Sequence, residues 1–469
     1  MLNYFPKFFT SKAISLYFIA LLVCNIIFFN HALSFQWWIF GIVEVVAFFY
    51  FANENTRKWS SFSEKKFIRT VFVTAIILRI IWVVFSYFYY TAMTGQPFEF
   101  DAGDAMGYHA EGTRVAALIT NGQLQVFFDR MKDNYSDMGY GLYLGFEYMI
   151  TNSSIIIERL LKAFYGAFTC VLIYRLAKRT FGEEAARMAA IFCMLMPNLI
   201  LYTGLHLKEI EMVLLSIWYL ERADFLLRSK KLNFQVIFPV LLLGGSLFFF
   251  RTVLGASALF ALFTALMFSS EHVLNMGKRA ILIVWLIGTA SFFVGGRIAN
   301  EVEEVWKARE ANQSISMELR TTQLNGNKYA KKMGAAVFAP MIFAIPFPTV
   351  VETPNQQNQK IINGGNFVKN VLAFFVLFAF VMIIREKKWR DYLLVGSFTI
   401  GYLLVLSFSA FAQSERFHQP VLPLELMLAA FGITLVTNKT KKYYKWWMIL
   451  LFFVILGWSW FKLAGRDMV

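Results

Sequence analysis

Charged residues and cysteines are both scarce in this sequence, and each shortage excludes a class of protein. Asp, Glu, Lys and Arg make up 16% of the 469 residues, whereas 58% are hydrophobic. A soluble globular domain carries roughly a quarter charged residues, so the chain is too apolar to be one. The three cysteines, Cys24, Cys170 and Cys193, all lie within apolar runs. We expect packed thiols there, which excludes a disulfide framework and a cysteine metal site.

Long apolar runs are what the sequence has in abundance. Runs able to cross a bilayer lie near residues 13–30, 34–52, 71–92, 154–176, 184–204, 209–226, 233–250, 252–270, 279–296, 367–385, 391–411, 420–436 and 445–462. They predict an all-α polytopic membrane protein with about thirteen transmembrane helices. We expect a single domain over residues 1–469. The sequence shows no internal repeat of the kind that inverted-repeat transporters often carry.

Many of the basic residues that produce the net charge of +15 lie in short loops. Short basic loops stay in the cytoplasm, so the loop at 54–69 and the N-terminus are predicted to be cytoplasmic. That loop carries Arg57, Lys58, Lys65, Lys66 and Arg69. The charge therefore indicates topology and contact with anionic membrane lipids, and nucleic acid is not expected as a partner.

Two long polar segments fall on the opposite, outer side by alternation. Residues 91–152 form the first outer loop, in which short helices are predicted near 105–120 and 123–132. Residues 297–366 form the second. Its moderately apolar patch at 335–348 is interrupted by Pro340, Pro346 and Pro348. We therefore expect a re-entrant or interfacial segment rather than another span.

Carboxylates are concentrated just beyond the third apolar run, between Phe98 and Glu111. If a helix begins at residue 103, Asp104 and Glu111 share one face with Tyr108. Asp101 extends the same stripe. Such a face suits a general base or a divalent cation. The alternative is an aspartate that caps the helix while Glu111 is solvated.

Cationic residues gather at the predicted outer ends of later runs. Lys208 precedes Glu209 at one run, and Tyr202, His206 and Glu209 are spaced as a helical stripe. Arg251 lies between two runs, and the turn at 413–420 contains Arg416 and His418. Cations that converge at this boundary suit a lipid phosphate. The alternatives are a helix-end ion pair, an interfacial anchor and an ordinary polar turn, and an internally paired arginine for Arg79 inside the third run.

Motifs for nucleotide binding are missing, since the sequence has neither a Walker loop nor a dinucleotide glycine fingerprint. An enzyme outside the cytoplasm lacks nucleotide sugars and ATP, so an activated lipid is its natural donor. A series of short motifs follows the chain in order: Gly103-Asp104-Ala105-x-x-Tyr108-His109, Tyr140-Gly141-Leu142-Tyr143, Ile157-Glu158-Arg159-Leu160-Leu161, Ala177-Lys178-Arg179-Thr180-Phe181-Gly182, Met196-Pro197, Leu207-Lys208-Glu209 and Arg416-x-x-x-Pro420-x-x-Pro423.

This ordered set resembles the GT-C superfamily of polytopic glycosyltransferases. The similar members are bacterial and relate to protein O-mannosyltransferases and the lipid A aminoarabinose transferase. The resemblance implies a GT-C fold with outer-face loop helices in the bacterial inner (plasma) membrane. It also implies an active site on the periplasmic or extracellular face. The expected reaction is inverting transfer of a sugar from a polyprenyl-phosphate donor to a lipid-linked glycan, lipid or protein acceptor.

The resemblance also implies roles for individual residues. Asp104 matches the catalytic base, and Asp101 is the neighbour able to share or take that role. The residues expected at the donor phosphate are Lys208, Arg251, Arg416 and His418. Those expected at the acceptor or sugar are Tyr108, His109, Glu111 and Glu209. No metal-ligand set and no cofactor is identified, and a need for Mg²⁺ or Mn²⁺ is left open.

Two alternatives belong to other classes. A polysaccharide polymerase or ligase would use a lipid-pyrophosphate glycan donor and the same cationic residues. A glycolipid transporter or flippase would place its ionisable residues at mid-membrane and show a repeat. In this sequence those residues gather at one predicted face, which favours an enzyme.

The predicted topology can be tested with single cysteines at Ser136 and Asn327, one in each predicted outer loop. We expect both thiols to react with a membrane-impermeant reagent in intact cells, because both loops are assigned to the outer side. Protection of either position would overturn the assignment.

Overall fold

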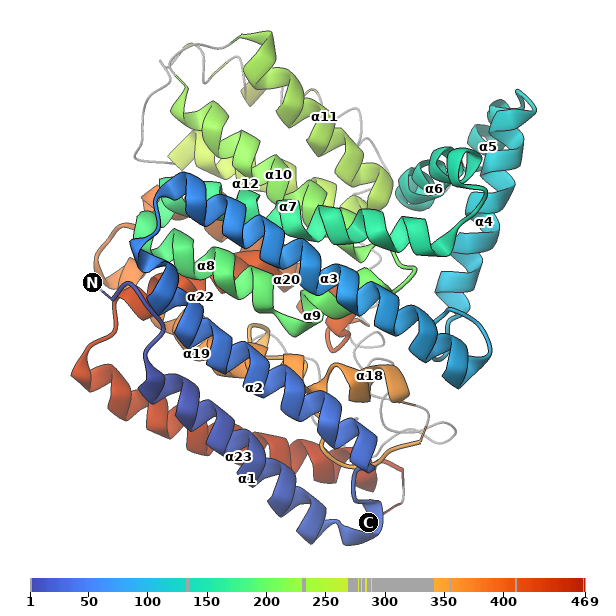
Figure 1. Ribbon diagram of the computed structural model, residues 1–469. Coiled ribbons are helices and arrows are strands. Elements are labelled where there is room, and N and C mark those ends of the chain that lie inside the picture. Colours follow the sequence, from blue (N-terminus) through green and yellow to red (C-terminus); the bar gives the residue numbers. More distant parts are fainter. Residues whose placement is uncertain are drawn as a thin grey trace.

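In the computed structural model the chain folds into helices (Figure 1). The structure describes residues 2–131, 135–229, 233–268, 341–354, 356–409, 411–466 and 468, together with Gly277, Ala280, Ile283, Val284 and Gly288. Across these residues the one β-type pairing is an isolated antiparallel bridge between Ala32 and Val351. The predicted all-α class is confirmed.

The helices follow the chain in two blocks. The first contains α1 (Lys7–Ile27), α2 (Phe35–Lys58), α3 (Glu64–Thr94), α4 (Gly103–Thr120), α5 (Leu124–Met131), α6 (Met138–Thr151), α7 (Ile155–Phe181), α8 (Glu183–Leu195), α9 (Pro197–Leu201), α10 (Glu209–Arg228), α11 (Phe234–Phe250) and α12 (Thr252–Phe268). The second contains α18 (Gln357–Ile361), α19 (Asn363–Arg385), α20 (Leu393–Ser407), α21 (Glu415–His418), α22 (Leu422–Thr434) and α23 (Asn438–Ala464). Short 3₁₀ turns are η1 (Phe29–His31), η2 (Trp59–Ser61), η3 (Tyr135–Asp137), η4 (Tyr202–Gly204) and η6 (Trp389–Tyr392).

Five of the described helices are long and apolar enough to cross a membrane: α1, α2 with its extension to Ser61, α3, α19 and α23. A sixth span results if α8 and the α9–η4 segment count together, although they are bent by 51°. These helices identify a membrane protein. The other predicted runs also form helices, except that most of the run at 279–296 lies outside the described residues. The number of about thirteen spans stays a prediction.

Helix packing forms a bundle around α7 and α8. α7 packs against α3, α8 and α10, while α22 packs against α8 and α19. α2 contacts α19 and α8, and α12 contacts α20. α4, α5 and α6 form a separate group beyond one end of α3 and α7, and α18 lies at the same end (Figure 1). The predicted outer segments that the structure describes therefore gather at one end of the bundle.

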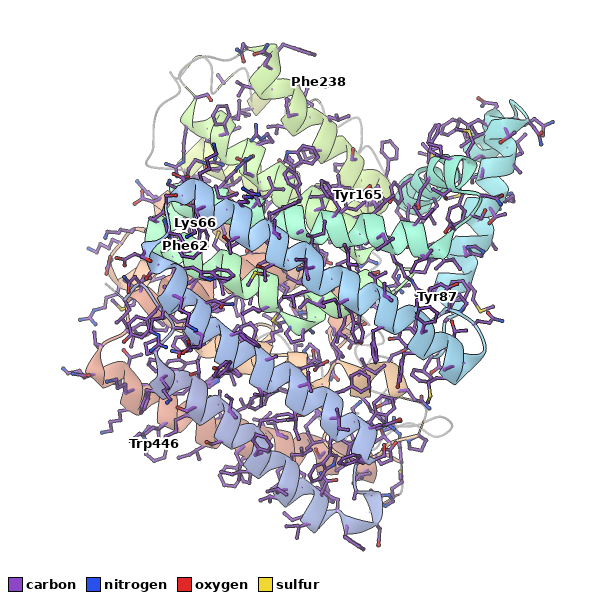
Figure 2. The ribbon with its side chains drawn as sticks, in the orientation of Figure 1. Phe62, Lys66, Tyr87, Tyr165, Phe238 and Trp446 are labelled. Atoms are coloured by element: carbon purple, nitrogen blue, oxygen red, sulfur yellow. The ribbon has the colours of Figure 1, made fainter. Side chains whose placement is uncertain are left out.

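The opposite end of α3 carries the basic loop. Lys66 Nζ lies 4.1 Å from the centre of the Phe62 ring, far along α3 from Tyr87 (Figure 2). Lys178 on α7 pairs with Glu64 on α3 at 2.7 Å, which joins two predicted cytoplasmic junctions. The segments predicted on opposite sides thus lie at opposite ends of the bundle.

The predicted loop helices are present as α4 and α5, and α4 begins at Gly103, two residues before the helix predicted near 105–120. The patch predicted as re-entrant is described from Met341 onward. There it forms a single turn, and its carbonyls accept hydrogen bonds from α19, as in Lys369 Nζ to Ile345 O at 2.9 Å. Asn327, chosen above as a labelling position, lies outside the described residues.

Arg79 is buried in the middle of α3 and donates to a carbonyl that Pro197 leaves without its helical partner. Because proline has no N–H, the carbonyl of Cys193 loses its helical partner at the α8–α9 bend. Arg79 Nη2 donates to Cys193 O at 3.2 Å, and Nη1 donates to Met194 O at 3.4 Å. A Cβ on Gly166 would lie 2.4 Å from Arg79 Nε, so this glycine makes room for the guanidinium. Arg79 is therefore internally paired.

This arrangement predicts that Gly166→Ala and Arg79→Met each destabilise the protein by about 1–3 kcal/mol, through a clash and through lost hydrogen bonds respectively. Thermal unfolding in detergent measures both. Gly166→Ala should cost less in the Arg79→Met background, because the clashing group is gone. Gly245→Ala is the matched control, since nothing lies within 4 Å of a Cβ built there. Equal cost of Gly166→Ala in both backgrounds would contradict this account.

Candidate functional site

A cavity of about 350 Å³ opens where four segments far apart in the sequence meet. Glu99, Asp101 and Asp104 line it from the α3–α4 connection and the start of α4. Arg416 on α21 lines it from the C-terminal part of the chain. A further carboxylate, Glu415, lines it beside Arg416. An apolar part of the wall comes from residues before α10 and from α18 and its C-cap, including Leu201, Leu205, Leu207, Ile361 and Ile362. The first cavity therefore combines carboxylates, a guanidinium and an apolar surface.

Arg416 holds two carboxylates at once. Its Nη1 donates to Asp104 Oδ2, and its Nε donates to Glu209 Oε1. The Glu209 side chain is 0% exposed and that of Arg416 is 16% exposed, whereas that of Asp104 is 67% exposed. The guanidinium thus joins a buried carboxylate to an accessible one. Three residues predicted for the site are brought together here.

The capping alternative for the two aspartates is wrong. The N-cap of α4 is Ala102, and no side chain makes a capping hydrogen bond there. Asp101 precedes it in the left-handed region, with φ of 51°, a conformation that aspartate tolerates better than most residues. Both carboxylates therefore remain available to the first cavity.

A second cavity of about 370 Å³ lies on the α5–α6 side of α4. Asp104, Tyr108 and Glu111 line it together, as expected for residues on one helix face. Arg130 of α5 and Gly107 of α4 also line it. Asp104 and its neighbour Gly103 are the residues that line both cavities among those described. Asp104 therefore lies on the wall between the two cavities.

Glu111 is paired rather than merely solvated. Arg114 Nη2 donates to Glu111 Oε1 at 2.9 Å, and Arg130 binds the same oxygen. Partial burial of the carboxyl favours its neutral form, but the two guanidinium groups outweigh that effect and lower the pKa of Glu111. The second cavity thus has an ionised, charge-balanced rim.

The four residues predicted at the phosphate do not all reach the first cavity. Lys208 Nζ pairs with Asp137, which lines the second cavity, and donates to Phe250 O at 2.9 Å. The Arg251 guanidinium lies 4.1 Å from the centre of the Phe417 ring. His418 is buried, with Nδ1 2.9 Å from Lys369 Nζ. Arg416 is the member of this set that lines the first cavity among the described residues.

The predicted stripe of Tyr202, His206 and Glu209 does not form on one helix. Tyr202 lies in η4, the next four residues are not regular helix, and α10 begins at Glu209. The break follows Gly204, where a Cβ would meet Ser86 and Trp82 of α3 at 2.3 and 2.7 Å. Because Gly204 packs closely on α3, the chain leaves the helix there and the predicted stripe does not form.

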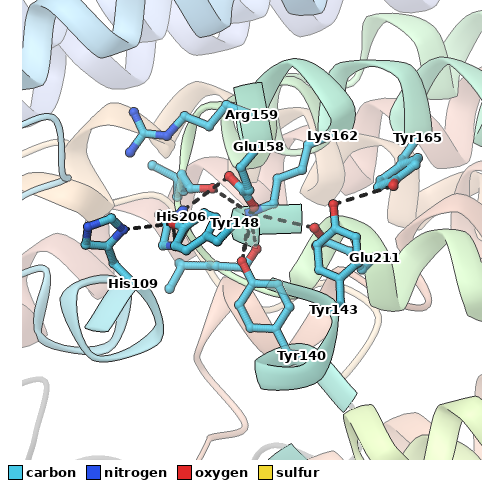
Figure 3. Close-up of polar contacts among 12 residues, drawn as sticks. His109, Tyr140, Tyr143, Tyr148, Glu158, Arg159, Lys162, Tyr165, His206 and Glu211 are labelled. Carbon is cyan, nitrogen blue, oxygen red and sulfur yellow. Dashed lines mark hydrogen bonds and ion pairs between the residues drawn. The ribbon is translucent and has the colours of Figure 1, made fainter. Parts of the chain in front are cut away.

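His109 belongs to a buried polar network instead of a cavity wall (Figure 3). Its Nδ1 lies 2.8 Å from the hydroxyl of Tyr148 on α6, which lies 3.2 Å from His206 Nε2. His206 Nδ1 is 3.2 Å from Glu158 Oε2, and Glu158 pairs with Lys162 at 2.5 Å. Sequence reasoning missed Tyr148, Glu158 and Lys162. The signal was present, because Glu158 and Lys162 are ionisable residues spaced i, i+4 in a predicted span.

Glu99 is a further cavity residue that sequence reasoning did not select. It is buried, and its Oε2 has no hydrogen-bond partner within the described part of the chain. Burial raises the pKa of Glu99, against the opposing effect of Arg159. No three His, Cys, Asp or Glu side chains of the described segments are grouped so as to hold a metal ion.

Comparison of the chain with protein-family models, with curated proteins and with solved structures finds no match. The site provides an accessible carboxylate between two cavities, a guanidinium beside it, and an apolar wall on one side.

Proposed function

We propose that this protein is a polytopic membrane glycosyltransferase that moves a sugar from a polyprenyl-phosphate donor to an acceptor at the outer face. The observation that carries the proposal is the meeting of Asp104 and Arg416 on the wall of a partly apolar cavity. A lipid-linked phosphosugar requires these three components: a cation for the phosphate, an apolar surface for the prenyl chain and a base for the acceptor.

The donor fits the first cavity. Leu201, Leu205 and Leu207 offer the apolar wall to the prenyl chain, and the fork of Arg416 suits a phosphate. A phosphate that binds Arg416 competes with Asp104 for Nη1. Donor binding therefore releases the Asp104 carboxylate from its ion pair.

The acceptor fits the second cavity, where Tyr108 and Glu111 face the opposite side of Asp104. A hydroxyl group is a poor nucleophile at neutral pH, so its proton must leave as the new glycosidic bond forms. Asp104 accepts that proton from the acceptor while the donor phosphate leaves on the other side. Attack from the side opposite the leaving group inverts the anomeric carbon.

In this proposal the bundle is of the GT-C type, with about thirteen spans by the length of its apolar runs. The N-terminus and the basic loop at 54–69 are cytoplasmic, and both cavities open at the outer face of a bacterial inner membrane. The gathering of α4, α18 and α21 residues around the first cavity, opposite the basic end of α3, supports this orientation.

A lipid-pyrophosphate donor is the second candidate, as used by a polysaccharide polymerase or ligase. It is favoured by Arg251, whose guanidinium lies over the ring of Phe417, the residue that follows Arg416. The Nη1 of Arg251 is buried without a hydrogen-bond partner among the described residues. Such a guanidinium can take up a second phosphate.

The test uses purified protein in lipid nanodiscs with polyprenyl-phosphate sugars and, separately, with polyprenyl-pyrophosphate glycans. Release of polyprenyl phosphate supports the first proposal, and release of polyprenyl pyrophosphate supports the second. Transfer of intact glycolipid between leaflets, with no release of either product, would overturn both.

The base is tested by Asp104→Asn, which keeps the shape of the side chain but cannot accept the proton. We expect turnover to fall by at least about 10²-fold with donor binding retained. The fold should be preserved, because the side chain is 67% exposed. Asp101→Asn is the matched variant from the same cavity wall. Near-full turnover of Asp104→Asn with an inactive Asp101→Asn would move the base to Asp101.

The acceptor cavity is tested by Gly107→Leu. Nothing lies within 4 Å of a Cβ built at Gly107, and this residue lines the second cavity, so a leucine there occupies part of that cavity. Leucine also favours the helix over glycine by about 0.8–1 kcal/mol. We expect a higher KM for the acceptor and unchanged binding of the donor. Gly457→Leu, at an exposed and equally open position of α23, is the control. An unchanged acceptor KM would place the acceptor elsewhere.

A further inference from the structure

A continuous chain of hydrogen bonds runs from α4 to the first turn of α7, at the end of the bundle. It links His109 on α4, Tyr148 on α6, His206 before α10 and Glu158 on α7, with spacings of 2.8, 3.2 and 3.2 Å (Figure 3). Each member comes from a different segment. The chain therefore ties the helix that carries Asp104 to the bundle.

The direction of every hydrogen in this chain follows from its buried end. Glu158 is paired with Lys162 and accepts, so the Nδ1 of His206 must carry the proton that it shares with Glu158. In a neutral imidazole the other nitrogen then accepts, so the Tyr148 hydroxyl donates to His206 Nε2. The hydroxyl oxygen in turn accepts from His109 Nδ1–H. All three donors point toward Glu158.

The buried end of the chain is fixed. Glu158, Lys162 and His206 are each 0% exposed, and Tyr148 is 2% exposed. Lys162 Nζ also donates to the carbonyls of Leu205 and Leu207, at 2.9 and 2.6 Å, on either side of His206. A buried hydrogen bond with no water to replace it costs much more to break than an exposed one. The movable end is therefore His109, which is partly exposed on α4.

The position of α4 has little other support from the bundle. α4 packs mainly on α6 and α5, which belong to the same group beyond the end of α3 and α7. Apart from this chain, the polar links that the described residues provide from α4 to segments outside α5 and α6 include the ion pair between Asp104 and Arg416, at an exposed carboxylate, and an exposed hydrogen bond from Thr113 to Ser153 at 3.3 Å. The Lys208 ammonium also lies 6.0 Å from the centre of the Tyr108 ring. Exposed pairs are worth little.

We propose that Tyr148 and His206 are positioning residues that hold α4, and Asp104 with it, against the first cavity. Their effect on the reaction rests on the proposed function, whereas their effect on α4 does not. A displacement of the base by about 1 Å is enough to cost roughly 10²-fold in rate.

The direction of the chain makes it sensitive to acid. A proton on His206 Nε2 turns this acceptor into a donor and leaves the Tyr148 hydroxyl without its partner. The titratable and charged groups that face the two imidazoles are Glu158, Arg159 and Lys162 on α7 and Tyr148 on α6, and Tyr148 itself faces Glu147.

Burial lowers the pKa of both His206 and His109, against the opposing effect of Glu158. When α4 is held against the bundle, the pKa of each histidine is lowered, so the neutral imidazole is the form that holds α4 in place. The position of α4 is therefore stable above the ordinary pKa of about 6.5 and loses stability as the pH falls below it.

Tyr148→Phe tests the role, because it removes the central hydroxyl and keeps the ring. Tyr143→Phe is the matched control, since Tyr143 is also on α6 and its hydroxyl lies 3.4 Å from that of Tyr165 on α7. We expect Tyr148→Phe to speed hydrogen–deuterium exchange in α4, with Tyr143→Phe resembling the wild type. We also expect kcat to fall roughly ten- to a hundredfold with an unchanged donor KM.

The pH profile provides the third readout. The wild type should lose kcat as the pH falls below about 6.5, whereas Tyr148→Phe should have a lower plateau without this limb, because its chain is already broken. Unchanged α4 exchange in Tyr148→Phe would overturn the proposal, whatever happens to kcat. Faster exchange in a protein whose wild type transfers no sugar would support the positioning of α4 while the proposed function fails.

Discussion

The double ion pair of Arg416 is the interaction on which the candidate site depends. Glu209 is completely buried at the start of α10, and its Oε2 has no hydrogen-bond partner among the described residues. A buried carboxylate is stable only when a charge compensates it, and removing one partner of such a pair costs about 3–5 kcal/mol. Arg416 therefore compensates the buried charge of Glu209 on α10 and also lines the first cavity. Its removal would mix a structural loss with a functional one, whereas Asp104 is exposed and can be changed with little structural effect.

The same constraint shapes the interior of the bundle. Arg79 donates to the carbonyl of Cys193, which Pro197 leaves without its helical partner, and Lys162 is paired with Glu158 and donates to backbone carbonyls. Such charges lower the average hydropathy of a helix without shortening it. α7 has 27 residues and α10 has 20, long enough to span a bilayer, yet neither is among the five helices that are both long and apolar enough to cross a membrane. A count of spans by length and composition therefore leaves out long helices that carry internally paired charges.

Local patterns predicted local structure well. The all-α class and the shared face of Asp104, Tyr108 and Glu111 follow from apolar run lengths and helical periodicity. The caps were less predictable, because Ala102 takes the position that either aspartate could have filled.

These local patterns did not predict which residues far apart in the sequence contact one another. Lys208, Arg251 and His418 share charge and a predicted side of the membrane with Arg416, and this similarity suggested a single phosphate cluster. The structure gives them different partners, Asp137, the Phe417 ring and Lys369, because packing decides which side chains meet. The chain from His109 to Glu158 draws on four segments, so no spacing along the sequence could have revealed it.

The proposed function also assigns a reason to the ion pair of Asp104. Asp101 and Asp104 both line the first cavity, but Asp104 alone of the two is bound by Arg416 and also lines the second cavity. A carboxylate oxygen that accepts from a guanidinium is not free to accept the proton of an acceptor hydroxyl. If the donor phosphate takes the guanidinium, that oxygen becomes free only when the donor is present. Asp101 lacks that link, because no ion pair connects it to Arg416 within the described residues. On this argument Asp104 is the better base of the two, and its activation is coupled to donor binding through a single arginine.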